Sequence, residues 1–429
     1  MLPGSRKDEH CYPVPKFDLT PSEVEDFKEK LEGFHEQFHD CFLRSESRAN
    51  FFRYMSGQFS ELERKSIEPI ALSIEDGKVR AMQRFVSEAP WDEERIMLKY
   101  RSIVNTDLGS PDGAIIFDET SFPKKGNDSI GVSRQYCGST GKVDNCQVGV
   151  FSAYVSESGY SLVDKRLFIP KKWFEDEYQT RREKCKLPGE ISFKTKPQLA
   201  IEMLNNLVAE QTLPFKYVLG DSIYGNSPDF IDAVSSLPGI SYFVSVPDNI
   251  QCWPQIPTTI KKQYKYKGEL RTKTVLADET QKPVKLSTFA RSINSYYWYR
   301  RTVSEGTKGP IIYEFTRRRV KISNSNLPQK MVWLVIRRTI GSKPDYSYFL
   351  SNASISTRLS TFVWLSGLRW AIEQCFEEAK SDLGMDHYEV RKFLGWHHHM
   401  ITCMLGHFFL WHLKLSLGKK STVHYSLAA

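Results

Sequence analysis

The stretch Ala114-Ile115-Ile116-Phe117-Asp118 decides how the middle of this sequence folds. A short apolar run with β-branched and aromatic residues predicts a buried strand, here one that ends at Asp118. The stretch Phe215-Lys216-Tyr217-Val218-Leu219-Gly220-Asp221 repeats this pattern later in the chain. An acid at the end of a buried strand is desolvated unless a cation or hydrogen-bond donors compensate. Asp118 and Asp221 are therefore candidate site residues, although each alone is also typical of an aspartate that caps a turn.

Between these two aspartates the sequence predicts two further strands and a helix. The strands are expected at 148–155 and 160–169, joined into a hairpin by a Ser-Glu-Ser-Gly turn, and the helix at 197–211. The order strand, strand, strand, helix, strand indicates an α/β fold with a mixed sheet. A parallel arrangement of the first and fourth strands would bring both aspartates to one end of the sheet, where ligand sites of open sheets lie.

The segments on either side have different patterns. Residues 20–110 show helical periodicity, with helices expected over 45–65, 77–87 and 92–104, and predict a separate helical domain. From 242 to 349 the chain is rich in β-branched and aromatic residues, and a long helix is expected from 357 to 383. We therefore expect four segments: a helical domain (1–110), a core in two parts (111–241 and 351–429), and a β-rich insertion (242–350).

Charge is concentrated in the β-rich segment. The chain carries a formal net charge of +8, and residues 251–350 contain twenty Lys or Arg against six Asp or Glu. Such a segment is typical of a protein that binds a polyanion, because cations that neutralise phosphates release counterions. A basic but merely solvated surface explains the charge alone about equally well.

A helical segment near the C-terminus adds a third carboxylate. Arg369 and Glu373 are four residues apart and Lys380 follows seven residues later, so all three project from one helix face. The alternative is an ordinary helical ion pair with a solvent-facing lysine. If this helix lies beside the sheet, it adds a carboxylate for a metal site and two cations for phosphates.

The spacing Arg-x3-Glu-x6-Lys resembles the signature around the catalytic glutamate in a group of DDE transposases of bacterial insertion sequences. Three stretches, Phe122-Pro123-Lys124-Lys125-Gly126, Asn145-Cys146-Gln147-Val148-Gly149-Val150-Phe151 and Asp386-His387-Tyr388-Glu389-Val390-Arg391, are similar to the insertion-sequence 701 family in particular. The resemblance extends over roughly residues 45–410.

The resemblance implies a ribonuclease H-like catalytic domain, which is a mixed sheet with flanking helices. The β-rich insertion interrupts this domain, and an all-helical DNA-binding domain, residues 1–110, precedes it. Asp118, Asp221 and Glu373 correspond to the triad that holds two Mg²⁺ ions, for which Mn²⁺ can substitute. Arg369 and Lys380 correspond to DNA phosphate contacts. The implied reaction is cleavage of double-stranded DNA at the terminal repeats, followed by strand transfer of the 3′-hydroxyl into target DNA. A homodimer on paired ends is implied as well.

One departure and two rival carboxylates qualify this assignment. The wider group has a tyrosine three residues before the arginine, where this chain has Ser366, so the resemblance leaves open whether excision uses a hairpin intermediate. Glu377 shares a helix face with Glu373, but the spacing to Arg369 and Lys380 selects Glu373. Glu119 follows Asp118 and points to the other face of an extended strand.

Further candidate DNA contacts follow from composition. Lys124 and Lys125 come soon after the first aspartate, and a solvated loop explains them nearly as well. Trp298 lies in a run of aromatic residues before Arg300 and Arg301, which suits stacking on unpaired bases. A strand with an aromatic face in the core is the somewhat better explanation for any single ring. Three consecutive histidines, 397–399, are expected to contact phosphates or to lie at the surface.

The eight cysteines form no Cys-x-x-Cys pair, so we expect reduced thiols in a cytoplasmic protein. The resemblance to transposases of bacterial insertion sequences implies that this protein is bacterial and associated with the nucleoid. The apolar run from Met400 to Leu417 is interrupted by two histidines and a lysine, and predicts a buried helix without any membrane contact. Two other functions stay open: a nuclease without strand transfer, and a domesticated transposase that only binds DNA.

Overall fold

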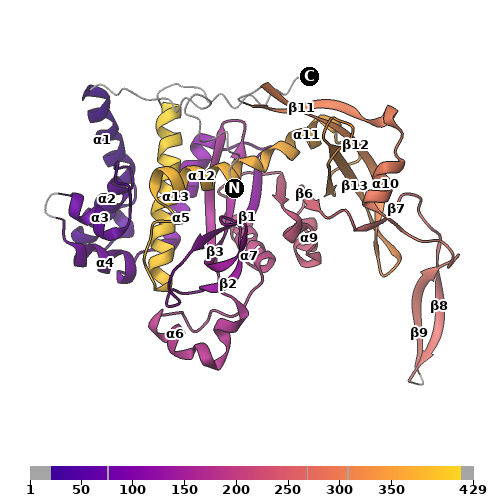
Figure 1. Ribbon diagram of the computed structural model, residues 1–429, viewed down its shortest axis with the longest axis horizontal. Helices are drawn as coiled ribbons and strands as arrows, with labels where there is room; N and C mark the ends of the chain where they lie inside the picture. Colours follow the sequence, from indigo (N-terminus) through magenta and orange to yellow (C-terminus); the bar gives the residue numbers. More distant parts are fainter. Residues whose placement is uncertain (1–20, 75–76, 268, 307–308, 417–429) are drawn as a thin grey trace. The chain divides into compact units, whose positions relative to one another are not determined.

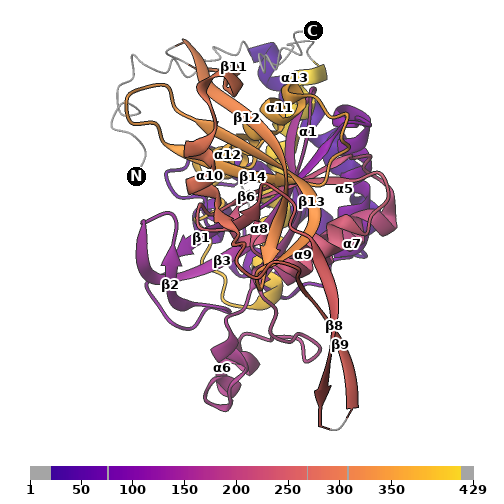
Figure 2. The same ribbon diagram turned by 90° about the vertical axis from the view of Figure 1, so that its right-hand side faces the viewer.

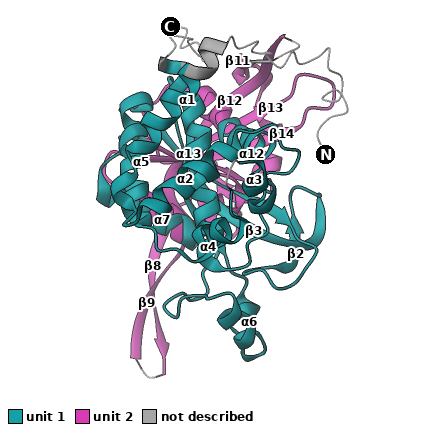
Figure 3. Cartoon of the chain, turned by 90° about the vertical axis from the view of Figure 1, so that its left-hand side faces the viewer, with its two compact units in different colours: residues 1–216, 369–423 teal, residues 217–368, 424–429 magenta. Residues whose placement is uncertain are grey.

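The computed structural model describes residues 21–74, 77–267, 269–306 and 309–416. The chain divides into two compact units, coloured separately in Figure 3. Unit 1 comprises residues 1–216 and 369–423, and unit 2 comprises residues 217–368 and 424–429. The finer division into four domains at 110, 241 and 350 stays a prediction.

Unit 1 begins with helices, as the periodicity of its sequence predicts. They are α1 (Pro21–Glu36), the 3-10 turn η2 (His39–Cys41), α2 (Ser45–Gln58), α3 (Ile67–Ser73), α4 (Val79–Glu88) and α5 (Glu93–Leu108). The helices expected over 77–87 and 92–104 are confirmed as α4 and α5. The helix expected over 45–65 is α2, which ends at Gln58, seven residues earlier than predicted. Asp92 caps α5, because its side chain accepts a hydrogen bond from the backbone N–H of Arg95.

Helix α13 (Phe393–Ser416) lies between these helices and the strands of unit 1 (Figure 1). Phe409 contacts Phe27 and Phe34 of α1 at ring-centroid distances of 5.4 and 5.3 Å, while Phe408 lies 5.6 Å from Tyr100 of α5. The expected buried helix is thereby confirmed as far as residue 416; Leu417 lies outside the described residues. No helix in the described part of the chain is long and apolar enough to span a bilayer.

The prediction that the histidines 397–399 lie at the surface is wrong. All three are buried, because α13 packs against helices α2, α4 and α5 of unit 1. His398 stacks on Trp91 with ring centroids 3.9 Å apart, and His399 accepts or donates a hydrogen bond with the Tyr54 hydroxyl at 2.7 Å. Burial lowers the pKa of His399 to about 3, so this ring is neutral and part of the core.

Four strands of unit 1 form antiparallel pairs. They are β1 (Ala114–Pro123), β2 (Ser133–Cys137), β3 (Lys142–Ser156) and β4 (Gly159–Phe168), and β3 pairs with each of the other three. The predicted hairpin is confirmed as β3–β4. The expectation that the first strand ends at Asp118 is wrong, because residues 119–123 continue the ladder with residues 146–150 of β3. Asp118 therefore lies in mid-strand, opposite Phe151.

Helices cover both faces of these strands, which explains why β3 is buried continuously from residue 146 to 156. The remaining elements of unit 1 are η3 (Lys171–Phe174), η4 (Asp176–Tyr178), α6 (Gln179–Lys184), α7 (Lys196–Glu210) and α12 (Trp370–Leu383). Helix α7, expected at 197–211, starts with a capping box in which Thr195 and Gln198 exchange hydrogen bonds.

Unit 2 is mainly β-structure, as expected. Its strands are β5 (Tyr217–Gly220), β6 (Ser241–Val246), β7 (Gln251–Trp253), β8 (Thr259–Tyr266), β9 (Glu269–Leu276), β10 (Val284–Lys285), β11 (Tyr299–Gly306), β12 (Gly309–Asn324), β13 (Leu327–Arg338) and β14 (Tyr346–Ser351). Its helices are α8 (Ser222–Gly225), α9 (Pro228–Ser235), α10 (Leu286–Ser292), η5 (Ser295–Tyr297) and α11 (Leu359–Leu368).

The strands of unit 2 pair in the order β5, β6, β14, β13, β12, β7, β10, with β11 also on β12. Strands β5 and β6 are parallel and joined through α8 and α9, whereas the pairs from β6 to β10 are antiparallel. Helix α10 lies within residues 242–350, which were expected to be β-rich, and is an exception to that expectation. The long helix expected over 357–383 is also two helices, α11 and α12, interrupted at Arg369.

Candidate active site

Asp118 points to the face of strand β1 on which helix α12 lies. Residues directly opposite each other in an antiparallel pair have side chains on the same face, so Asp118 shares its face with Phe151. Phe151 contacts Phe376 of α12 with ring centroids 5.4 Å apart. Asp118 is half-buried, and its Oδ1 accepts a hydrogen bond from the backbone N–H of Glu119 at 2.8 Å. The structure therefore brings Asp118 and α12 together within unit 1.

Lys380 joins the two elements directly. Its ammonium donates a hydrogen bond to the Thr120 hydroxyl at 2.7 Å, and lies 5.3 Å from the centre of the Phe122 ring. Side chains two residues apart in a strand point to the same face, so Thr120 and Phe122 share the face of Asp118. Burial lowers the pKa of Lys380 below its usual value. Lys380 thus fixes the position of α12 along β1, a role that its sequence pattern did not reveal.

On helix α12, Glu373 lies one turn before Phe376 and two turns before Lys380. The side chain of Glu373 is 52% exposed. Arg369 donates a hydrogen bond to Glu373 Oε1 at 3.0 Å, as the four-residue spacing predicts. An exposed pair of this kind contributes only about 0.3–0.5 kcal/mol to stability. The carboxylate is therefore accessible, with a cation already beside it.

The other carboxylates of this region have different neighbours. Glu119 is on the opposite face of β1, where Lys196 of α7 forms an ion pair with it at 2.7 Å. The prediction that Glu119 points away from Asp118 is confirmed. Glu378 is bound by the Tyr160 hydroxyl at 2.9 Å and by His407 at 2.8 Å, so it belongs to the interior. Glu377 is half-buried and keeps its place as the rival of Glu373.

Asp221 belongs to unit 2 and follows strand β5 directly, as expected. Its Oδ1 accepts a hydrogen bond from the backbone N–H of Ile223 at 2.8 Å, which caps the short helix α8. Gly225 closes this turn, because a Cβ there would lie 2.0 Å from the carbonyl oxygen of Ser245. The local sequence thus holds Asp221 rigidly at the end of a buried strand.

Carboxylate oxygens are the ligands that Mg²⁺ takes in proteins, so the chemistry of the three acids fits the expected ions. Asp118 and Glu373 lie in unit 1 and Asp221 in unit 2. Within the described residues of either unit, no three His, Cys, Asp or Glu side chains group so that they could hold a metal ion. The assignment of all three acids to one metal site stays a prediction.

The two lysines after Asp118 differ in their surroundings. The ammonium of Lys124 donates a hydrogen bond to the carbonyl of Tyr388 at 2.8 Å and lies 3.4 Å from the centre of its ring. Burial lowers the pKa of Lys124 to about 8. Lys125 is exposed. Only Lys125 therefore has the exposure expected of a phosphate contact, while Lys124 packs against the segment that follows α12.

Ser366, which stands at the position of the expected tyrosine, is buried in α11. Its side chain is 8% exposed and its hydroxyl donates a hydrogen bond to the carbonyl of Val363 at 2.7 Å. An aromatic ring at this position would have to displace its neighbours. An exposed aromatic residue does occur on α12, where Trp370 is 47% exposed and three residues before Glu373. The i, i+3 spacing from Trp370 to Glu373 already indicates that the two side chains are neighbours on the helix surface.

The aromatic run of unit 2 separates into buried and exposed rings. Trp298 is 8% exposed, and Arg338 lies 4.0 Å from the centre of its ring. This placement fits the alternative that the ring belongs to the core. Arg300 and Arg301 are exposed at the start of β11, where Arg300 forms an ion pair with Glu314 at 3.2 Å. Tyr296 is the most exposed ring of the run, at 80%.

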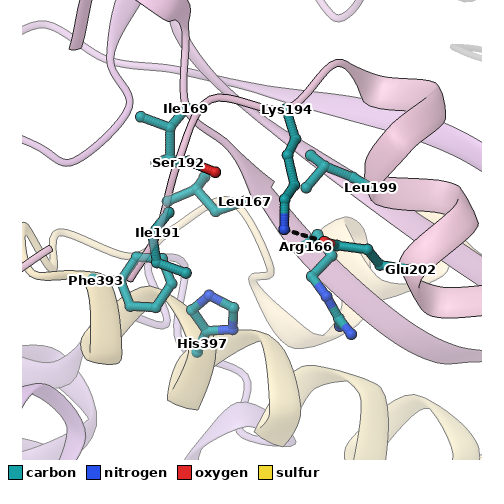
Figure 4. Close-up of a pocket in the computed structure, with 10 residues that line it drawn as sticks. All are labelled: Arg166, Leu167, Ile169, Ile191, Ser192, Lys194, Leu199, Glu202, Phe393 and His397. Atoms are coloured by element: carbon teal, nitrogen blue, oxygen red, sulfur yellow. Dashed lines mark hydrogen bonds and ion pairs between the residues drawn. The ribbon is translucent and has the colours of Figure 1, made fainter. Parts of the chain in front are cut away.

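A pocket in unit 1, shown in Figure 4, lies away from these residues. Its empty volume is about 490 Å³, and Arg166, Lys194, Glu202 and His397 are among its lining residues. Lys194 and Glu202 form an ion pair across its wall. None of the three acids and none of the predicted DNA-binding Lys, Arg and Trp residues lines this pocket, so it has no part in the site described above.

All seven cysteines among the described residues are free thiols, which confirms the expectation for them; Cys11 lies outside the described residues.

Comparison with known proteins gives two findings. Residues 37–310 match the sequence profile of a family described as DDE superfamily endonuclease. This range includes Asp118 and Asp221, and ends before Glu373. A second match is to a protein of Microchaete diplosiphon named "Probable transposase for insertion sequence element IS701", which is 25% identical over 364 residues. That match covers 83% of this chain and 80% of the relative.

Proposed function

Because the chain belongs to the family of DDE superfamily endonucleases, we propose that it is the transposase of a bacterial insertion sequence. It hydrolyses phosphodiester bonds at the ends of the element and joins the freed 3′-hydroxyl to target DNA. The observation that carries the proposal is the placement of Asp118 and α12 on one face of β1, since α12 supplies Glu373. The similarity to a probable transposase along most of both chains supports it.

Asp118, Asp221 and Glu373 are proposed as the ligands of two Mg²⁺ ions, or of Mn²⁺ in their place. When bound, such ions activate the attacking oxygen and stabilise the leaving oxygen of a phosphoryl displacement. The chain's own residues have distinct tasks. Thr120 and Lys380 hold α12 against β1, Arg369 is placed beside Glu373 to meet a DNA phosphate, and the cap at Asp221 fixes that carboxylate. Two copies of the chain are proposed to hold the paired ends.

The proposal is tested by incubating the purified chain and Mg²⁺ with the DNA that flanks its own gene, and sequencing the products. Cleavage at the element ends and joined products are expected. The rate of cleavage should fall at least about 10³-fold in each of the variants Asp118→Asn, Asp221→Asn and Glu373→Gln, because metal-site ligands act as a unit. Binding to end DNA should remain.

Each variant has a matched control. Glu119→Gln removes the neighbouring carboxylate on the other face of β1, Asp229→Asn removes an exposed acid of α9, and Glu377→Gln removes the rival glutamate. These three should keep cleavage. Loss in Glu377→Gln with activity retained in Glu373→Gln would move the third ligand to Glu377. Cleavage without any joined product, even when a 3′-hydroxyl end and target plasmid are supplied, would indicate a nuclease without strand transfer.

A further inference from the structure

A two-stranded hairpin of unit 2 has a structure that the fold itself does not require. Strands β8 and β9 form a sheet of their own. All residues of β8 and the first six of β9 are exposed, and the hairpin extends away from the other strands of its unit (Figure 1 and Figure 2). An isolated hairpin is marginally stable in water, so it gains little for the fold. A partner that covers it would explain its length and exposure.

The charge of the hairpin identifies the chemistry of that partner. Residues 259–276 contain six cationic side chains and one carboxylate, that of Glu269. The cations are Lys261, Lys262, Lys265, Lys267, Arg271 and Lys273. Like charges that face each other across a strand pair destabilise it, yet Lys262 lies directly opposite Lys273. The repulsion between these two lysines lowers the stability of the hairpin, and a bound polyanion would neutralise it.

The register distributes these cations over both faces of the ribbon. Lys262, Arg271 and Lys273 share one face, because Lys262 pairs with Lys273 and Arg271 with Tyr264. Lys261 and Lys265 share the other face. A ribbon that lay flat on a single phosphate backbone would need cations on one face only. Cations on both faces suit a ribbon that enters between two phosphate backbones.

Two tyrosines arrange the cations on the first face. Arg271 lies 4.9 Å from the ring centre of Tyr266, and Lys273 lies 5.3 Å from that of Tyr264. Both rings are themselves exposed. Contacts of this kind restrict the cationic side chains, which lowers the entropy lost when phosphates bind.

We propose that the β8–β9 hairpin is an arm that inserts into the major groove of double-stranded DNA. The major groove is about 12 Å wide and admits a two-stranded β-ribbon, whereas the minor groove is about 6 Å wide and has to be deformed to take one. Eight residues of extended chain span about 26 Å, which is enough to follow the groove for most of a helical turn. The arm deepens the proposed function, on which it rests for the source of the DNA, but its binding requires no cleavage.

The test measures duplex binding by the full-length chain, without divalent metal, on a labelled duplex of unrelated sequence over a range of salt concentrations. The arm variant is Lys262→Gln/Arg271→Gln/Lys273→Gln. The control, Lys282→Gln/Lys330→Gln/Lys343→Gln, removes the same charge at exposed positions of unit 2 outside the hairpin. The arm variant should bind at least about tenfold more weakly and lower the slope of log K against log salt by about 2 to 3, because each lost phosphate contact lowers it by about one.

A second measurement uses the unaltered chain, so that it does not depend on the folding of a variant. Acetylation of lysines, read by mass spectrometry, should be slowed by duplex DNA at Lys261, Lys262 and Lys265, and not at Lys330 or Lys343. Equal loss of binding in the arm and control variants, or no protection of the hairpin lysines, overturns the inference. So does a change of oligomeric state in the arm variant with duplex binding unchanged, which would assign the hairpin to a second copy of the chain. Absence of cleavage with hairpin protection intact would instead refute the proposed function alone.

Discussion

The ammonium of Lys380 lies 2.7 Å from the hydroxyl oxygen of Thr120, although the two residues are 260 positions apart in the chain. Thr120 is two residues after Asp118 on the same face of β1, and Lys380 is seven residues after Glu373 on α12. This hydrogen bond therefore connects the elements that carry two of the three proposed metal ligands. It also means that Lys380 is held by the protein itself before any DNA phosphate is present.

The first prediction concerns this contact. Thr120→Val should lower the free energy of unfolding by about 1–3 kcal/mol, because it leaves a partly buried ammonium without its hydroxyl acceptor. Adding Lys380→Met should recover part of the loss, since no desolvated charge then remains. Urea unfolding of the two single variants and the double variant gives the coupling energy, expected at about 0.5–3 kcal/mol. Strictly additive effects would show that the bond does not position α12.

Arg369 provides a second prediction, which separates a functional role from a structural one. Arg369→Gln should change the free energy of unfolding by less than about 0.5 kcal/mol, because its ion pair with Glu373 is exposed. Its binding to end DNA should weaken about tenfold through the loss of a charge-assisted hydrogen bond to phosphate. Arg64→Gln, which breaks the more exposed pair with Glu389, should leave DNA binding unchanged. Fluorescence anisotropy compares the two variants, and equal affinities would remove Arg369 from the proposed site.

The aromatic run of unit 2 is the subject of the third prediction. Trp298→Ala should lower the free energy of unfolding by about 3–5 kcal/mol, because the ring is buried. Tyr296→Ala should leave stability within about 0.5 kcal/mol, since that ring is exposed. If an aromatic of this run stacks on unpaired bases, Tyr296→Ala weakens binding of a single-stranded oligonucleotide about tenfold. Unchanged binding in Tyr296→Ala would leave the run with a packing role alone.

The fourth prediction is a pH dependence of stability. Burial lowers the pKa of Lys124 to about 8 from the ordinary value of 10.5, so between these values the unfolded chain binds more protons than the folded chain. Stability linked to this group therefore rises as pH increases from 8 to 10.5, and the full penalty applies below pH 8. Urea unfolding at several pH values should show this rise in the unaltered chain relative to Lys124→Met. Lys125→Met, at an exposed position, should show no such difference. If the stability difference between the unaltered chain and Lys124→Met does not change with pH, burial does not lower the pKa of Lys124.

Local patterns explain which parts of the fold were predictable. Strands β1, β3, β4 and β5 follow from short apolar runs, and α7 from a helical period, because both signals extend over a few neighbouring residues. The pair Arg369–Glu373 follows from helix geometry alone. The opposite orientation of Glu119 follows from the alternation of a strand.

Expectations failed where the outcome depends on distant partners. The first strand continues past Asp118 because β3 is long enough to pair with residues 119–123, although the polar residues Glu119, Thr120 and Ser121 interrupt the apolar run. Three consecutive histidines suggested a polar surface, yet α13 packs against the N-terminal helices and the strands of unit 1, and this packing buries all three rings.

The sequence by itself determined the class of fold, the family resemblance and the candidate carboxylates, because periodicity and motif spacing are properties of short segments. Only the tertiary structure decided what surrounds each candidate side chain. It placed Asp118 on the α12 face of β1, gave Lys380 a hydroxyl partner, buried Lys124 against Tyr388 and Trp298 against Arg338, and left the β8–β9 hairpin exposed. Burial and hydrogen bonding depend on contacts between residues far apart in the chain, which no local pattern contains.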